Sequence, residues 1–286
     1  MNERERIMYK ILGNISETNA PIIFKGALIT KLILAENGFT NIERATKDID
    51  ANWIGTPPTM SVLTDTINHS LGEMSILFEA VPSREYGEMK SVGVSIREKK
   101  TGDEILSMDI DIKSVSGIRT YYQGEMAIKG VLANEILVDK IAACSSDAVY
   151  KWRTKDVIDV YALSHCVEVN VKKIFNVSED VKRKILSFDA FYNKKSELKH
   201  SYEKLKGITG KPEFETLYAY LDKFFKPFAN QEKIEAIWNS KNTSWHKGKE
   251  LSMESWTKLI QQEKEKRQIT GHETEQSKNK IKSWEK

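Results

Sequence analysis

The sequence is poor in cysteine. It contains only Cys144 and Cys166, and no CxxC pair. Both occur in apolar stretches, where a free cysteine is usually buried. This usage argues against a disulfide framework and against a cysteine-based zinc site. We expect two buried thiols in a reducing compartment.

Long apolar runs are also missing. No segment approaches the roughly 18 consecutive apolar residues that a membrane span needs. The first ten residues, MNERERIMYK, are charged and lack the apolar centre of a signal peptide. We therefore expect a cytoplasmic protein with no membrane partner.

Neither sign of charge dominates the chain. The 44 basic and 41 acidic residues leave a net charge of +3, so total charge neither indicates nor excludes a nucleic-acid partner. Hydrophobic residues make up 40% and charged residues 30% of the 286 positions, which is typical of a folded soluble protein. This length suggests one large domain or two modest ones.

Hydrophobic periodicity divides the chain into two parts. Up to about residue 125 it predicts a mixture of helices and about five strands. The predicted strands are 22–24, 47–54, 75–81, 89–98 and 105–113, and the helices between them include 27–36 and 59–72. After residue 130 the pattern is helical, with helices expected at 132–149 and 154–167 and throughout the remainder.

We therefore predict an α+β fold. It consists of a mixed-sheet α/β domain over residues 1–130, a helical domain over 131–270 and a charged, disordered tail over 271–286. A cleft between the two domains is the expected ligand site.

Two predicted strands each carry a pair of aspartates two residues apart. Asp48 and Asp50 lie in RATKDID, and Asp109 and Asp111 lie in MDIDIK. Residues two apart on a strand share a face, about 6–7 Å apart. If the two strands are neighbours, the carboxylates converge, and like charges so placed need a cation between them. Mg²⁺ prefers such oxygen ligands together with substrate phosphates. The plainer alternative is a solvated sheet face.

Gly26 lies between a predicted strand and a predicted helix. A tight turn there would present the backbone N–H groups of a helix N-terminus, which is a ready site for phosphate. Taken alone, the glycine is better explained by an ordinary tight turn.

Two blocks together resemble a known family. FKGAL followed by RATKDID, and EILVDKIAACSSDAVYKWRTKDVIDVYAL at 135–163, are similar to motifs of the AbiEii-type nucleotidyltransferase toxins, members of the polymerase-β-like nucleotidyltransferase superfamily. The matching residues are Lys25, Gly26, Arg44, Thr46, Asp48, Asp50, Glu135, Lys140, Arg153, Lys155, Asp156, Asp159 and Tyr161. The resemblance covers about residues 20–165. One position departs from it, because Ala27 stands where the family usually has glycine or serine.

The resemblance implies a role for each matching position. Nucleotide binding falls to Lys25, Gly26, Ala27, Arg44 and Thr46, with Gly26 and Ala27 around the β- and γ-phosphates. Magnesium or manganese would be bound by Asp48 and Asp50 together with Asp109 and Asp111. The catalytic set would be Asp111, Lys140, Lys155 and Asp156, with Asp111 activating the attacking hydroxyl and Asp109 as the fallback.

The implied function is a Mg-dependent nucleotidyltransferase that moves an NMP from an NTP to an acceptor. The acceptor would be RNA, such as the 3′ end of a tRNA, or a protein hydroxyl. The biological role would be the toxin of a toxin–antitoxin or abortive-infection system in phage defence, with a separately encoded antitoxin as partner.

Two other readings stay open. Ala27 leaves open a catalytically inactive, nucleotide-binding or interaction relative. The segment 171–211, basic and interleaved with aromatics, would suit an RNA-binding structural protein, although a solvated helical face over an aromatic core is the favoured explanation.

Overall fold

We analysed a computed structural model of the chain, which describes residues 3–44, 48–86 and 90–247. The part up to His246 forms one compact unit. Thr46, the predicted tail at 271–286 and the end of the predicted helical domain lie outside the described residues. The division into domains at residue 130 stays a prediction.

A seven-stranded mixed sheet forms the base of this unit, in the order β4-β5-β6-β3-β1-β8-β7. The central strands β3 and β6 are parallel, as are β1 and β8, and the other neighbours are antiparallel. The strands are β1 (Ile22–Lys25), β3 (Asp48–Trp53), β4 (Phe78–Tyr86), β5 (Ser91–Glu98), β6 (Glu104–Ile112), β7 (Ile118–Gln123) and β8 (Met126–Val131).

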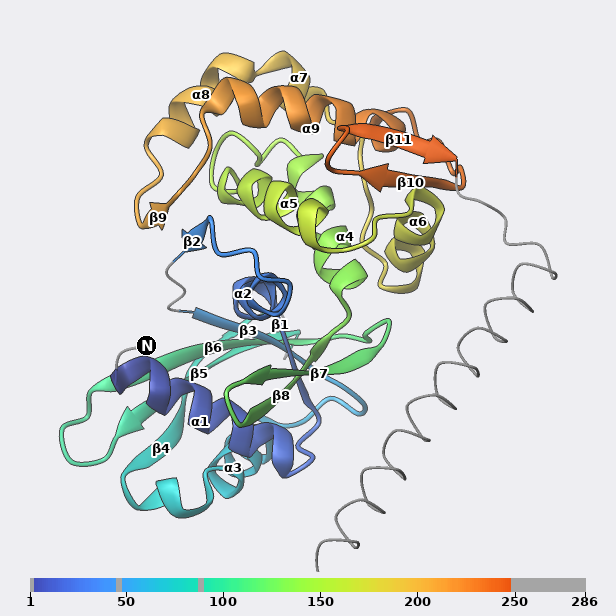
Figure 1. Ribbon diagram of the computed structural model, residues 1–286. Coiled ribbons are helices and arrows are strands. Elements are labelled where there is room, and N and C mark those ends of the chain that lie inside the picture. The colour runs from blue at the N-terminus through green and yellow to red at the C-terminus, as the bar shows by residue number, and fades with distance from the viewer. Residues whose placement is uncertain (1–2, 45–47, 87–89, 248–286) are drawn as a thin grey trace, which may run out of the picture. The chain divides into compact units, whose positions relative to one another are not determined.

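Helices cover both faces of the sheet (Figure 1). On one face lie α1 (Glu3–Glu17) and α3 (Met60–Ser70), which is followed by the short 3₁₀ helix η1 (Gly72–Ile76). On the other face α2 (Gly26–Glu36) packs between β1 and β3 below it and the later helices above it. The polar face of β3 and β6 therefore opens on the side of α2.

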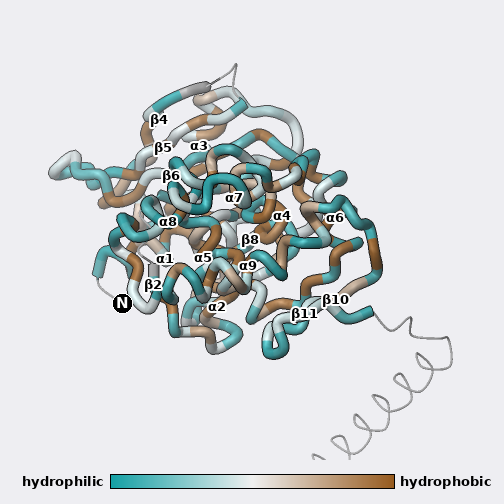
Figure 2. The backbone as a smooth tube through the Cα atoms, turned by 90° about the horizontal axis from the view of Figure 1, so that it is seen from above, coloured by the Kyte–Doolittle hydropathy of each residue, from teal (hydrophilic) through white to brown (hydrophobic). Residues whose placement is uncertain are grey.

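The chain after β8 folds over α2. Its helices are α4 (Ala133–Cys144), α5 (Lys155–Cys166), α6 (Val171–Asp180), α7 (Asp189–Asn193), α8 (Lys195–Glu203) and α9 (Phe214–Ala229), and it ends in the hairpin of β10 (Ala236–Asn239) and β11 (Ser244–Lys247). Figure 2 shows hydrophobic segments gathered toward the middle of this unit, with mostly hydrophilic loops at its periphery. Among the described residues, no helix combines the length and apolar character that a bilayer crossing requires.

The α+β class and the elements around the aspartates are confirmed, but four expectations are wrong, including the burial of Cys166. The sheet gains the hairpin β7–β8 beyond the five expected strands, and residues 72–76, where the third strand was to begin, are 3₁₀. The C-terminal part is not all helical, because β10 and β11 pair there. Such short strands depend on tertiary contacts that periodicity does not carry. Cys144 is buried, whereas Cys166 is half-buried; both are free.

A two-residue pairing joins the sheet side to the helical side. Strand β2 (Glu43–Arg44), just before β3, pairs antiparallel with β9 (Ile208–Thr209), between α8 and α9. Gly210 follows at φ +68°, and a Cβ built there would lie 1.7 Å from the carbonyl oxygen of Asn41. Two independent reasons thus require glycine at this position: its positive φ and the close approach of the Asn41 carbonyl oxygen.

Replacing Gly210 by alanine should disrupt this pairing. We expect Gly210→Ala to lower the free energy of unfolding by about 2–3 kcal/mol, as backbone strain and a steric clash add. The matched control is Gly102→Ala, at φ +77° but with open space around the added methyl, which should cost about 1–2 kcal/mol. Urea denaturation measures both, and equal losses would contradict the assigned clash.

Candidate active site

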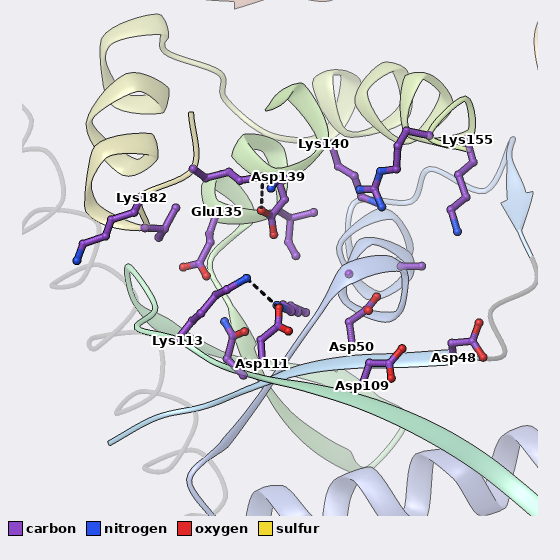
Figure 3. A pocket seen from close by; sticks show the side chains of 18 of the residues that line it. Asp48, Asp50, Asp109, Asp111, Lys113, Glu135, Asp139, Lys140, Lys155 and Lys182 are labelled. Carbon is purple, nitrogen blue, oxygen red and sulfur yellow. Dashed lines mark hydrogen bonds and ion pairs between the residues drawn. The ribbon is translucent and has the colours of Figure 1, made fainter. Parts of the chain in front are cut away.

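A pocket of about 1130 Å³ lies between the sheet and the helices. Its floor comes from β1, α2, β3 and β6, and its opposite wall comes from α4, the start of α5 and the segments 181–183 and 205–208. Figure 3 shows Asp48, Asp50, Asp109 and Asp111 on the floor, with Lys155 pointing toward this floor from the opposite wall. Of the predicted site residues whose side chains the structure describes, all but Asp156 line the pocket.

The turn from β1 into α2 is fixed by glycine. Gly26 has φ +67°, and a Cβ there would lie 2.1 Å from Oδ2 of Asp50. The residue before the helix, Lys25, makes no side-chain capping bond. The first-turn N–H groups of a helix have no intrahelical partner. Gly26 and Ala27, both in the pocket floor, therefore offer an anion site next to Asp50.

Strand pairing brings the aspartates together as the alternation predicted. In the parallel register of β3 and β6, Asp50 is opposite Asp109 and Asn52 is opposite Asp111. Asp48 is exposed at the start of β3, and Asp50 is half-buried. The floor thus becomes more enclosed from Asp48 toward Asn52, which is 3% exposed.

Protein cations already compensate the two carboxylates of β6. Arg84 pairs with Asp109. The Asp111 carboxylate lies 2.8 Å from the Lys25 ammonium and 3.1 Å from that of Lys113. Burial would raise the pKa of Asp111, but these two ammonium groups outweigh it and hold the pKa below its usual value.

Asp50 is in a different situation. Burial raises the pKa of its carboxyl group against the attraction of Lys25, Lys140 and Lys155, and Asp109 raises it further. No hydrogen bond or ion pair within the described residues reaches this carboxylate. In the same part of the chain, no three acidic, histidine or cysteine side chains form a ready-made metal cluster.

The second predicted block forms a buried ion network. The ammonium of Lys140, 7% exposed, lies 2.8 Å from Oδ1 of Asp156 and 2.7 Å from Oδ2 of Asp159. Arg153 Nε lies 2.6 Å from Oδ2 of Asp156. Burial would lower the pKa of Lys140, but Asp159 and Asp156 outweigh it and hold that pKa well above its usual value.

This network orients the cations of the pocket wall. Asp156 is fully buried and holds Arg153, whose side chain is 34% exposed and reaches the pocket. Lys155 begins α5 and also lines the pocket. Lys140 has its charge matched by two carboxylates, so it serves the pocket mainly by fixing Asp156 in place.

Some pocket residues were not singled out from the sequence. Asn52 follows Asp50 at strand spacing, so the same alternation could have identified it. Lys113 lies two residues after Asp111, where the same rule applies. The Arg84 side chain reaches Asp109 over Gly93 of β5, where an added Cβ would lie 2.5 Å from it. This contact spans three strands, so no local sequence pattern predicts it. Arg44 forms the β2 pairing through its backbone.

Removing the centre of the ion network should destabilise the fold. We expect Lys140→Met to lower the free energy of unfolding by about 3–5 kcal/mol, because two buried carboxylates lose their shared cation. The raised pKa keeps Lys140 charged, so the loss should persist from neutral pH to about pH 9. The measurement is denaturant unfolding at several pH values.

The matched control for this variant is Lys31→Met. Lys31 pairs with Glu5 at 3.4 Å on the surface, so its removal should cost less than about 1 kcal/mol. Equal effects of the two substitutions would contradict the structural role of Lys140.

Comparison with known proteins gives structural neighbours only. No family model matches the sequence, and no curated protein matches it. Among solved structures, MenT4, a nucleotidyltransferase toxin from Mycobacterium tuberculosis H37Rv, is 13% identical with a TM-score of 0.38, over 79% of this chain and 90% of that one.

ANT(2″)-Ia in complex with adenylyl-2″-tobramycin is 14% identical with a TM-score of 0.40, over 63% and 98% of the two chains. An antigenic nucleotidyltransferase-like protein from Paracoccidioides brasiliensis is 14% identical with a TM-score of 0.38, over 57% and 75%. Similarity at this level assigns neither an activity nor a substrate to this chain.

Proposed function

We propose that this chain is a metal-dependent nucleotidyltransferase that moves an NMP from an NTP to an acceptor hydroxyl and releases pyrophosphate. The observation that carries the proposal is the contact of Gly26 with Asp50. It places a strand-borne carboxylate directly beneath an uncapped helix N-terminus. One site thereby offers N–H donors for phosphate oxygens and an oxygen ligand for a cation, the two requirements of phosphoryl transfer.

The triphosphate would bind at the start of α2. The N–H groups of Gly26, Ala27 and the next residue have no carbonyl acceptor within the helix, so they are free to donate to phosphate oxygens. The helix dipole adds positive potential at the same place. Alanine supplies the same N–H as glycine or serine. The departure at Ala27 therefore removes a hydroxyl but leaves the backbone donors in place, which favours an active member over an inactive one.

A magnesium or manganese ion fits the Asp48–Asp50 pair. Mg²⁺ is usually held by one or two carboxylates plus substrate phosphates, so a cluster of three protein ligands is not required. Asp50 is half-buried with a raised pKa, and a cation beside it would offset the desolvation of its charge. When bound, the ion would neutralise charge on the triphosphate and align it for displacement.

The transfer itself needs a carboxylate to accept a proton. The acceptor oxygen forms a bond to the α-phosphorus, the bond from that phosphorus to the β-bridging oxygen breaks, and pyrophosphate leaves. The hydroxyl proton passes to a floor carboxylate. The register puts Asp109 beside Asp50, and a single cation, Arg84, pairs with it. Asp111 is held by two cations, Lys25 and Lys113. Geometry thus favours the fallback Asp109 over Asp111 for this role.

The opposite wall would stabilise developing negative charge. Arg153 and Lys155 line the pocket, and Asp156 holds Arg153 in place. In Figure 3, Lys155 points toward the carboxylate floor. Preorganised cations of this kind act without reorganisation at the moment of reaction. Lys155 would contact phosphate, while Lys140 would act by positioning.

For the acceptor we propose RNA rather than a protein. The segment KWRTK at 151–155 places three cations around Trp152, which is 71% exposed. Cations alternating with an exposed aromatic ring suit a single-stranded polyanion whose bases stack. Because Arg153 and Lys155 also line the pocket, this surface continues into the site. By the motif resemblance, we propose that such transfer makes the protein a toxin restrained by a cognate antitoxin.

Asp50→Asn tests the proposed activity. The change removes the carboxylate charge at nearly constant shape, and we expect NMP transfer to fall at least about 100-fold. Purified protein is incubated with each α-³²P-labelled NTP, Mg²⁺ and total RNA, and label in RNA and in protein is measured separately. The matched control is Asp65→Asn on α3, whose carboxylate accepts a hydrogen bond from Ser61 away from the pocket and whose loss should leave transfer unchanged.

Three outcomes are decisive. Absence of transfer by the wild-type chain with every NTP would overturn the enzyme proposal, and NTP binding without transfer would favour the inactive relative. Label in protein alone would overturn the RNA acceptor.

A growth assay tests the proposed toxin role. Expressed in a bacterial host, the wild-type chain but not Asp50→Asn should arrest growth, and arrest by both would contradict the toxin mechanism.

A further inference from the structure

Asn52 is a buried side chain whose amide is not used by the fold. It is 3% exposed, and its Oδ1 has no hydrogen-bond partner. No hydrogen bond in the described part of the chain involves its Nδ2 either. The observation therefore holds whichever way the amide is flipped.

An unsatisfied buried amide costs free energy, and folded proteins rarely leave one without a reason. The contrast with Asn68 is direct. Asn68 donates to the Ala80 carbonyl at 3.1 Å and accepts from the Ala80 N–H at 2.7 Å, so both halves of its amide are satisfied.

The polar neighbours of Asn52 do not explain it. Its cross-strand partner is Asp111, whose carboxylate is occupied by Lys25 and Lys113. On its own strand, Asn52 shares the pocket-facing side with Asp48 and Asp50 by the two-residue alternation, and all three line the pocket. The amide is thus directed into the ligand space rather than used within the sheet.

The position of Asn52 along the pocket indicates which part of a ligand it meets. In Figure 3, Asp48 and Lys155 lie at one end of the pocket, and Lys113, Glu135 and Lys182 lie toward the other. Asn52 belongs to this second end, because it is opposite Asp111 in the register.

The second end offers apolar surface between its charged side chains. Ile112, Ile136 and Val181 line the pocket, and each is next in sequence to a charged residue of this end, Lys113, Glu135 and Lys182 respectively. The anion site at Gly26 lies between the two ends, and the RNA-binding surface of the proposed function begins at Lys155. A nucleoside has flat apolar faces and edges that donate and accept hydrogen bonds, so it matches what the second end offers.

We propose that the second end is the nucleoside subsite and that the Asn52 amide hydrogen-bonds the nucleoside of the bound NTP. This inference rests on the proposed function and adds to it a residue that selects the nucleotide. Such a contact uses both the donor and the acceptor capacity of the amide, which the ligand-free fold leaves unused.

The test compares Asn52→Leu with Asn68→Leu, which apply the same change to an unsatisfied and a satisfied amide. Binding of each α,β-methylene NTP with Mg²⁺ is measured by calorimetry, alongside inorganic tripolyphosphate and the melting temperature. We expect Asn52→Leu to weaken the preferred NTP about tenfold and to leave tripolyphosphate binding unchanged. Its melting temperature should rise by about 2 °C or more, since an unsatisfied polar group is removed.

Asn68→Leu should do the opposite, lowering the melting temperature and leaving nucleotide affinity unchanged. If Asn52→Leu weakens the affinity for the four NTPs to different extents, Asn52 contacts the base. If it weakens all four equally but does not weaken the binding of 2′- or 3′-deoxy NTPs, Asn52 contacts the sugar. If the leucine variant does not fold, Asn52→Ala carries the same affinity test.

Unchanged NTP affinity in a folded Asn52 variant would overturn the nucleoside subsite while leaving the proposed function standing. An equal loss for tripolyphosphate would overturn it too, because Asn52 would then act on phosphate. Failure of the wild-type chain to bind any NTP would instead overturn the proposed function itself.

Discussion

The site depends on one steric constraint, the absence of a side chain at Gly26. The β1–α2 turn crosses directly over Asp50, and a single methyl group at Gly26 would occupy the space of the carboxylate. This packing ties three elements together, because β1 pairs with β3 at Lys25 and Asp50, and β3 pairs with β6 at Asp50 and Asp109. The helix N-terminus and the carboxylates of two strands are thus positioned by one contact.

Charge balance explains how so many carboxylates coexist on one floor. Asp109 is matched by Arg84, and Asp111 is matched by Lys25 and Lys113. The buried Asp156 and Asp159 are matched by Lys140 and Arg153. Asp50 alone combines partial burial with a raised pKa and no direct partner among the described residues. The other carboxylates are therefore compensated by protein cations, whereas the charge of Asp50 is not. A bound cation at Asp50 would supply the missing positive charge.

Local patterns in the sequence were enough to predict the part of the fold that forms the floor. The alternation in DID and in MDIDI placed the aspartates on one face, and Gly26 marked the turn, because these features depend on strand and helix geometry alone. The alternation could also have reached Asn52 and Lys113. It does not predict the short hairpins β7–β8 and β10–β11, whose strands depend on tertiary contacts. Nor does it predict the pairing of Lys140 with Asp159 or of Arg84 with Asp109, since each joins segments distant in the chain.

We propose that the Gly26–Asp50 contact builds a metal-triphosphate site. A crystal structure of the protein with Mn²⁺ and an α,β-methylene NTP, with the ion located by anomalous scattering, tests this most directly. We expect an anomalous peak coordinated by Asp48 and Asp50, with the β- and γ-phosphates on the N–H groups of Gly26 and Ala27. A nucleotide bound away from the start of α2, or a metal that contacts neither Asp48 nor Asp50, would contradict it.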